Sequence, residues 1–246
     1  MNSEKWKNFQ KTRKKFRITT DELSSSLPGL KKTLQKFADS RSENSYTVDT
    51  PVVYNTALDD IKESDKIKLI LVADNPGRRE QAAENRRYLI GPSGKIAKKF
   101  FTDNPSLGIE FEKNVIILNK TPIHTPRTIE LREICKSDNK LIPILEKSQI
   151  DMALLLLEFQ ESLSCPVWIT GYSEMRRKGI FEIYTQKLKE IYSKKNELYQ
   201  NIFIYRHFSM NQFTIDLKQQ SQSGETVSKT LKRIGTEYKK RIIDKF

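Results

Sequence analysis

Cysteine, histidine and long apolar runs are all scarce in this sequence of 246 residues. The two cysteines, Cys135 and Cys165, are too few for a disulfide framework or a four-thiolate metal site, which fits a reducing compartment. The longest apolar run, 152–159, is interrupted by Glu158 and is far shorter than the roughly 20 residues of a membrane-spanning helix. The first residues lack the apolar stretch of a secretory signal. We therefore expect a cytoplasmic protein that does not span a membrane.

Positive charge, in contrast, is abundant: 44 lysines and arginines against 31 aspartates and glutamates give a formal net charge of +13. The excess gathers near both ends of the chain, at Lys5, Lys7, Lys11, Arg13, Lys14, Lys15 and Arg17, and at Lys229, Lys232, Arg233, Lys239, Lys240, Arg241 and Lys245. Such clusters neutralise phosphates and give a salt-dependent affinity that does not depend on sequence. The charge favours a polyanion as partner, nucleic acid before a membrane surface. A generic basic protein that its charge keeps soluble is the alternative.

The hydrophobic pattern predicts a helical N-terminal segment ahead of a larger domain. The segment is expected to be helical over 4–16, and Thr20 is a good N-cap for a second helix, which Pro28 interrupts. We therefore predict a basic helical extension over residues 1–45 and a domain over residues 46–246.

Within this domain, continuous apolar runs alternate with helical segments. The runs predict buried strands at 66–72, 114–118, 166–170 and 201–205. The segments predict helices at 93–101, 128–134, 141–162, 173–198 and 227–242. Apolar strands separated by helices are typical of a parallel sheet that is covered on both faces. The expected fold is α/β, with three α/β/α layers and a central, mainly parallel four-stranded sheet.

The loops that follow the predicted strands are the candidate site, because parallel sheets place their sites at the carboxyl ends of the strands. Three of the four loops present an amide or imidazole just past the strand: Asn75, Asn119 and His207. Such residues also cap turns without any further role. Their convergence on one edge of the sheet favours a functional site.

The motifs in these loops resemble those of the uracil-DNA glycosylase superfamily, closest to its mismatch-specific and single-strand-selective branches. Residues 73–77 (ADNPG) are similar to the G-x-N-P-G loop, and 89–94 (LIGPSG) to the F-V-G-P-A-G segment. Residues 115–119 (VIILN) are similar to the strand that ends in the uracil-reading Asn, and 207–209 (HFS) to the H-P-S motif. Residues 53–58 look like the segment that enters the domain. The order of the motifs along the chain carries the resemblance.

The resemblance implies an N-glycosyl hydrolase of DNA repair, which releases uracil or a related damaged base that is flipped out of DNA. His207 would donate to the departing base, whose negative charge is best stabilised in a water-excluded pocket. Asn119 would read the base edge, because an amide both accepts and donates. Asn75 would position the attacking water, and Asp74 would be a general base or a structural acceptor.

The same resemblance assigns contacts to the base and to DNA. Leu89 stands where many branches place an aromatic residue that stacks on uracil, and the neighbouring Tyr88 is the candidate to substitute for it. The candidates for contacts with DNA are Ser209, Lys95 and Arg206 at phosphates, and Met210 or Phe208 as a wedge in the base stack. The alternative for Phe208 and Met210 is that both are core residues.

The sequence departs from the family pattern at several positions. Ala73 replaces the first Gly of its loop, Phe208 replaces a Pro, and Gly77 leaves no Tyr to reject a 5-methyl group. The alternative function is therefore a member of the same fold that binds nucleic acid or nucleotides without cleaving them. The iron–sulfur branches use four cysteines, so no cofactor is expected. We expect a monomer whose partner is single- or double-stranded DNA.

Two other kinds of site are less well supported. The segment 91–95 (GPSGK) is too short for a P-loop, and Ile96 stands where the metal-binding Ser or Thr would be. His124, His207 and Asp74 lack the spacing of metal ligands. We therefore expect no metal.

Overall fold

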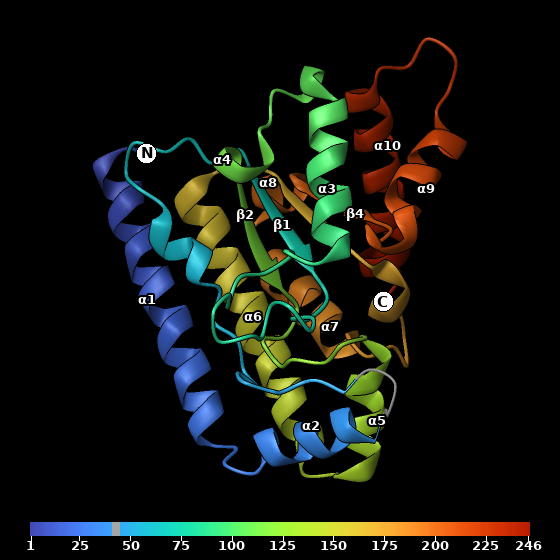
Figure 1. Ribbon diagram of the computed structural model, residues 1–246. Coiled ribbons are helices and arrows are strands. Elements are labelled where there is room, and N and C mark those ends of the chain that lie inside the picture. Colours follow the sequence, from blue (N-terminus) through green and yellow to red (C-terminus); the bar gives the residue numbers. More distant parts are fainter. Residues whose placement is uncertain (41–44) are drawn as a thin grey trace.

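A four-stranded sheet forms the centre of the computed structural model, which describes residues 1–40 and 45–246 (Figure 1). The strands are β1 (Leu69–Ala73), β2 (Val115–Asn119), β3 (Val167–Thr170) and β4 (Ile202–Tyr205). They are parallel and lie in the order β2-β1-β3-β4. Every residue of β1, β3 and β4 is buried, because helices cover both faces of the sheet. The prediction of a three-layer α/β/α fold around a parallel four-stranded sheet is confirmed.

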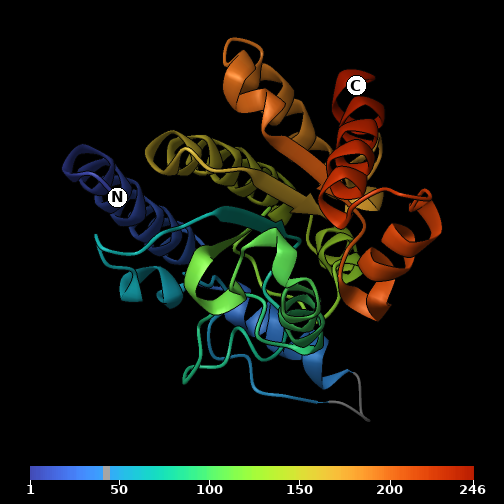
Figure 2. The same ribbon diagram turned by 90° about the horizontal axis from the view of Figure 1, so that it is seen from above.

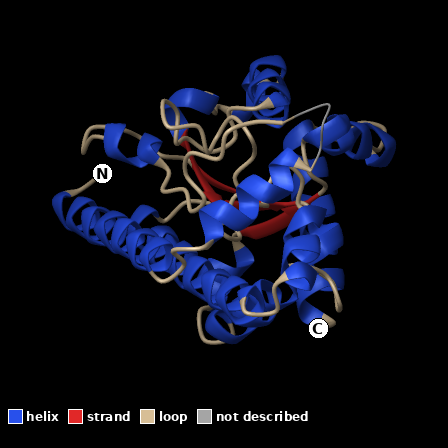
Figure 3. Ribbon diagram, turned by 60° about the horizontal axis from the view of Figure 1, so that its bottom comes forward, coloured by secondary structure: helices blue, strands red, loops and turns tan. Residues whose placement is uncertain are grey.

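Helices make up the two outer layers (Figure 3). The α-helices are α1 (Ser3–Ser25), α2 (Leu30–Asp39), α3 (Pro92–Asp103), α4 (Phe111–Asn114), α5 (Ile129–Ser137), α6 (Leu141–Leu163), α7 (Glu182–Tyr192), α8 (Asn196–Gln200), α9 (Gln212–Gln220) and α10 (Val227–Lys239). The shorter helices are η1 (Thr56–Asp60), η2 (Pro105–Leu107), η3 (Tyr172–Met175), η4 (Ser209–Asn211) and the π-helical η5 (Lys240–Asp244). Helices α6 and α7 lie on one side of the sheet, with α1 outside α6, and α3, α9 and α10 lie on the other (Figure 2).

An aromatic layer joins the sheet to α3 and α10. Trp168 of β3 stacks on Phe101 of α3, with 5.5 Å between ring centroids, and meets Tyr205 of β4 edge-on at 5.1 Å. Such pairs contribute about 0.5–1.5 kcal/mol each beyond the area that they bury. Helix α10 lies close to β4 because Gly235 has no side chain: a Cβ there would be 2.7 Å from the Cβ of Phe203. These contacts fix the edge strand β4 against the helices on this face of the sheet.

The N-terminal helix α1 is longer than predicted and packs along α6 (Figure 1). It runs without a break through Thr20, so the prediction of a second helix that starts there is wrong. The Thr20 hydroxyl donates back to the carbonyl oxygen of Phe16 at 3.1 Å instead of capping a new helix. Phe9 is 0% exposed, and its ring centroid lies 5.6 Å from that of Phe159 in α6. The N-terminal segment therefore shares one core with the sheet.

The longest helices, α1 and α6, have 23 residues each. Helix α6 contacts α1 on one side and α7 on another, so it links the N-terminal segment to the sheet layers. None of the helices in residues 1–40 and 45–246 combines the length and the apolar character that crossing a lipid bilayer requires.

Candidate active site

The carboxyl ends of the four strands lie along one edge of the sheet, because all the strands are parallel. Ala73 at the end of β1 pairs with Asn119 at the end of β2, and Thr170 of β3 pairs with Tyr205 of β4. The residues that follow are Asp74 and Asn75 after β1, Lys120 after β2, Gly171 after β3 and His207 after β4. Three strand ends thus bring the predicted residues to the same edge.

Asp74 forms an ion pair with a lysine that the sequence does not single out. Lys120 is 0% exposed, and its Nζ donates to Asp74 Oδ1 and to Thr170 O, at 2.5 Å in each case. Burial lowers the pKa of Lys120, and the charge of Asp74 opposes that effect. The other carboxylate oxygen of Asp74 accepts the hydroxyl of Thr128 at 3.2 Å. Both oxygens of Asp74 therefore have donors within the protein.

Asn75 is held by two threonines of the loop that precedes α5. Its Nδ2 donates to the carbonyl oxygen of Thr125 at 3.1 Å and to the Thr125 hydroxyl at 2.8 Å. Its Oδ1 lies 3.1 Å from the hydroxyl of Thr128. Both N–H groups of the amide are thus engaged, and Oδ1 keeps one further acceptor position.

Asn119 lies at the end of β2 with a side chain that no protein group binds. It is 1% exposed, and neither its Oδ1 nor its Nδ2 has a hydrogen-bond partner. An unpaired buried polar group costs about 1–3 kcal/mol. A ligand that presents a donor beside an acceptor would satisfy both atoms of this amide.

His207 is half-buried, and its neighbours set its protonation state. Its Nδ1 accepts the backbone N–H of Ser209 at 2.9 Å, so the neutral ring carries its proton on Nε2. Burial lowers the pKa of His207; the charge of Asp74 raises it and that of Lys120 lowers it further. The ring is therefore neutral near pH 7 and offers one N–H donor.

The residues predicted to stack on the base, Tyr88 and Leu89, are both buried. The Tyr88 ring packs against Phe16 of α1, with 6.4 Å between centroids, and its hydroxyl donates to the carbonyl oxygen of Val53. Leu89 has a φ of +55°, and its carbonyl oxygen would lie 1.5 Å from a Cβ at Gly94. Position 94 therefore requires a glycine, because the carbonyl oxygen of Leu89 lies where any side chain would begin. The Tyr88 ring belongs to the core between the sheet and α1.

Glu80 is a second buried charged residue that the sequence does not single out. Its carboxylate accepts the backbone N–H of Gly77 at 3.1 Å. Burial raises the pKa of Glu80 to about 7, against hydrogen bonds from the N–H groups of Gly77, Leu89, Ile90 and Gly91. The side chain thus joins the loop after β1 to the start of α3. The sequence does not predict this burial, because a glutamate three residues after a glycine is no recognisable signal of a buried side chain.

The turn after β4 presents one apolar side chain to solvent. Met210 is 84% exposed and has a φ of +51°, and Asn211 follows with a φ of +57°. Phe208, the other predicted wedge, is 0% exposed and stacks on Phe213 with 4.3 Å between centroids. The alternative that Phe208 is a core residue is therefore confirmed and its interpretation as a wedge is wrong, because its ring is part of the aromatic layer.

The predicted phosphate ligands differ in their surroundings. Lys95 is exposed in the first turn of α3. Arg206 is exposed as well, but its Nε donates to the Asp216 carboxylate at 3.2 Å. Ser209 is half-buried beside His207. Of the three residues, Lys95 is the one that is solvent-exposed near the N-terminus of a helix.

His124 braces the loop after β1 from inside the protein. Its Nδ1 donates to the carbonyl oxygen of Pro76 at 2.8 Å, and its Nε2 accepts the Tyr46 hydroxyl at 2.8 Å. Burial lowers the pKa of His124 to about 4, so the ring is neutral. Among the described residues, no group of three or more His, Cys, Asp or Glu side chains could hold a metal ion.

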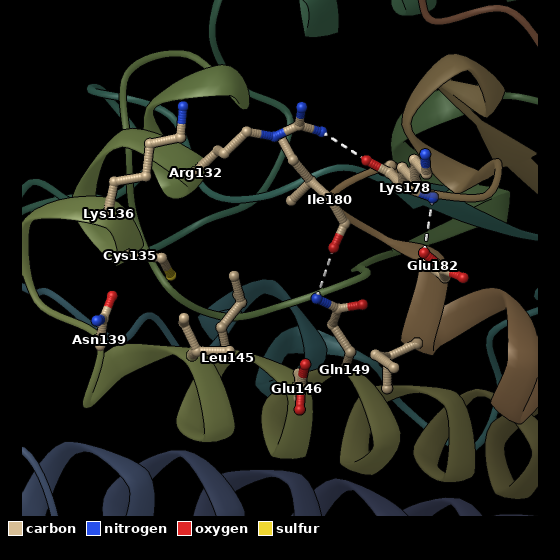
Figure 4. A pocket seen from close by; sticks show the side chains of 13 residues that line it. Arg132, Cys135, Lys136, Asn139, Leu145, Glu146, Gln149, Lys178, Ile180 and Glu182 are labelled. Carbon is tan, nitrogen blue, oxygen red and sulfur yellow. Dashed lines mark hydrogen bonds between the residues drawn. The ribbon is translucent and has the colours of Figure 1, made fainter.

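A separate cavity of about 310 Å³ lies between α5, α6 and the turn before α7 (Figure 4). Its polar groups hold that turn: Arg132 donates to the carbonyl oxygen of Lys178 at 3.0 Å, and Gln149 to that of Ile180 at 2.9 Å. The N–H of Lys178 donates to Glu182 at 2.7 Å. None of the predicted site residues lines this cavity.

No protein-family model and no curated protein sequence matches this chain. The resemblance to the uracil-DNA glycosylase superfamily therefore depends on the motifs, and its functional implications are proposals.

Proposed function

We propose that this protein is a DNA glycosylase, which hydrolyses the N-glycosidic bond of uracil or a related damaged base flipped out of DNA. The observation that carries the proposal is the buried, unpartnered amide of Asn119 at the end of β2. This amide belongs to the strand-end edge that also carries Asp74, Asn75 and His207.

Asn119 has the chemistry to recognise a ring N–H beside a carbonyl. Its Oδ1 would accept the N–H of the base and its Nδ2 would donate to the carbonyl oxygen, a pair that uracil presents and cytosine lacks. The correct base removes the penalty of leaving the amide unpaired, about 1–3 kcal/mol.

His207 and Asn75 supply the groups that the bond cleavage needs. Negative charge develops on the departing base during cleavage. The Nε2–H of a neutral His207 can donate to the base oxygen while this charge develops. Because Thr125 engages both N–H groups of Asn75, the Oδ1 atom is the one left to hold the attacking water.

The DNA must also release the base from its stack, at a cost of a few kcal/mol. Met210 lies three residues after His207 and is 84% exposed, and its side chain would fill the gap that the base leaves. The net charge of +13 attracts the phosphate backbone independently of its sequence.

Release of free base from single- and double-stranded oligonucleotides that contain uracil tests the proposal. We expect release by the wild type, and a rate at least about 10²-fold lower for Asn119→Ala and His207→Ala, the scale on which a lost transition-state donor acts. The matched control is Asn139→Ala, an exposed amide at the cavity of Figure 4, which should keep the wild-type rate.

Other lesions belong in the same assay, because Gly77 leaves no side chain to reject a 5-methyl group. Hypoxanthine, xanthine and mispaired thymine are the substrates of choice. If the wild type releases none of these bases and no uracil, the protein is not a glycosylase of this kind.

Binding of nucleic acid or nucleotides without cleavage is the second candidate function. It is favoured by the engagement of Asp74 with Lys120 and of Asn75 with Thr125, since both side chains are already bonded within the protein. Fluorescence anisotropy with the same oligonucleotides distinguishes the two functions. Binding that depends on Asn119, without release of any base, would establish the second.

A further inference from the structure

We propose that Lys120 is a positioning residue of the candidate site: its ammonium fixes the Asp74 carboxylate and balances the charge that this carboxylate places near His207. The role depends on the proposed function, in which His207 acts as a neutral hydrogen-bond donor. No motif of the sequence assigns it.

Lys120 spans the ends of three neighbouring strands. It follows β2, contacts Asp74 after β1 and donates to Thr170 at the end of β3. The ring centroid of Phe181 lies 5.0 Å from Nζ. A lysine that is 0% exposed is costly unless its charge is paired, so Asp74 is the group that allows Lys120 to be buried here.

Asp74 has its place because the residue after β3 is a glycine. A Cβ on Gly171 would lie 2.4 Å from Asp74 Oδ1, and Gly171 has a φ of +82°. The Thr128 hydroxyl lies 3.2 Å from Asp74 Oδ2 and 3.1 Å from Asn75 Oδ1, and it has one proton to share between them. By fixing Asp74, Lys120 therefore also fixes the group that orients Asn75.

Two opposite charges act on His207 through this arrangement. The carboxylate of Asp74 raises the pKa of His207, whereas the ammonium of Lys120 and burial lower it. Glu174 is the further acid that acts on Lys120. Without Lys120, the carboxylate alone would favour the charged imidazolium. With it, the two opposite charges act together on His207, whose pKa stays below its usual value.

An NMR titration of the imidazole signals tests this charge balance directly, because the chain has only two histidines. His124, whose pKa is lowered to about 4, is the internal control. In Lys120→Met, which keeps an unbranched side chain one atom shorter and removes the charge, we expect the pKa of His207 to rise by about 1, as a neighbouring charge produces. In Asp74→Asn it should fall by a similar amount.

The double variant Asp74→Asn/Lys120→Met separates charge balance from mere structural support. It leaves no unpaired buried charge, so it should fold even if Lys120→Met alone does not. We expect the pKa of His207 to return close to the wild-type value in this variant. A value unchanged in Asp74→Asn, or a double variant that differs from the wild type as much as Lys120→Met does, would overturn the proposal.

The pH profile of base release keeps this role distinct from the proposed function. For an active enzyme, the acid limb of kcat/KM should move upward in Lys120→Met by the same amount as the pKa measured by NMR. Shifts in the NMR titration without base release by the wild type would support the charge balance and refute the glycosylase. Base release without any shift would support the glycosylase and refute the role of Lys120.

Discussion

At the scale of single residues, the strand-end edge is built from polar side chains that the fold buries. Lys120 and His124 are 0% exposed and Asn119 is 1% exposed. Burial penalises the charged form of such groups, so their partners decide their protonation state. His124 is the simplest case, because burial lowers its pKa and keeps the ring neutral, although the hydrogen bond to the Pro76 carbonyl oxygen acts in the opposite direction.

His124 should make the protein less stable in acid. Its pKa is lowered to about 4 in the folded state, so the unfolded chain binds a proton first as the pH falls below about 6.5. The stability that this neutral ring contributes is complete above that pH and is lost progressively toward pH 4. Between pH 7.5 and 5 the expected loss in the free energy of unfolding is about 2 kcal/mol.

Urea unfolding at both pH values, for the wild type and for His124→Gln, checks this expectation. The variant should be less stable at pH 7.5 and should lack this part of the pH dependence, since other groups titrate equally in both proteins. The same pH dependence in both would show that another group is responsible.

The sequence predicts Asn75, Asn119 and His207 at one edge because each lies at the end of, or shortly after, an apolar run that indicates a buried strand. It does not reveal Lys120, because a lysine is expected at the surface unless its counter-ion is known. That counter-ion, Asp74, is brought to it only when β1 and β2 pair in register.

At the scale of secondary structure, α1 is an integral part of the core. Phe9 is 0% exposed against α6, so Phe9→Ala should lower the free energy of unfolding by about 3–5 kcal/mol, as the loss of a buried aromatic ring does. Ile18→Ala is the control on the same helix: this side chain is 45% exposed, and its loss should cost well under half as much.

Urea unfolding followed by circular dichroism measures both variants. A single transition that moves to lower urea in Phe9→Ala is the expected result. Two separate transitions in the wild type, with Phe9→Ala affecting only the smaller one, would instead mean that α1 unfolds independently of the sheet.

The strands and most helices are predictable because their apolar residues repeat at the spacing of their structure. Helix α9 escapes prediction, since its sequence QFTIDLKQQ buries only Phe213, Asp216 and Leu217. Thr20 misleads for another reason: a threonine followed by acids reads as an N-cap, yet its hydroxyl bonds to the preceding turn of α1.

At the scale of the whole molecule, the charge of +13 predicts an affinity for DNA that falls steeply with salt, with a log–log slope of about 0.9 per neutralised phosphate. Helix α1 displays part of this charge, because Lys7, Lys11 and Lys14 are exposed at spacings that place them on one side of the helix. Changing all three to Gln should weaken binding to every DNA sequence and reduce the slope.

Filter binding or anisotropy over a salt series measures the slope. The control replaces Lys99, Lys147 and Lys195 by Gln, which removes the same charge from lysines that already pair with carboxylates. Equal slopes in both triple variants would mean that α1 does not touch DNA. Deleting residues 1–17 is not a usable test, because it would remove Phe9 and Phe16 from the core.

The closeness of Gly171 to the Asp74 carboxylate also constrains how this protein can diverge. A side chain at 171 needs a smaller residue at 74, and a smaller residue at 74 leaves the Lys120 ammonium without its counter-ion. Mutations at these positions are therefore tolerated in concert and not singly. Relatives of this chain should inherit the three residues together or have lost them together, however far apart they stand in the gene.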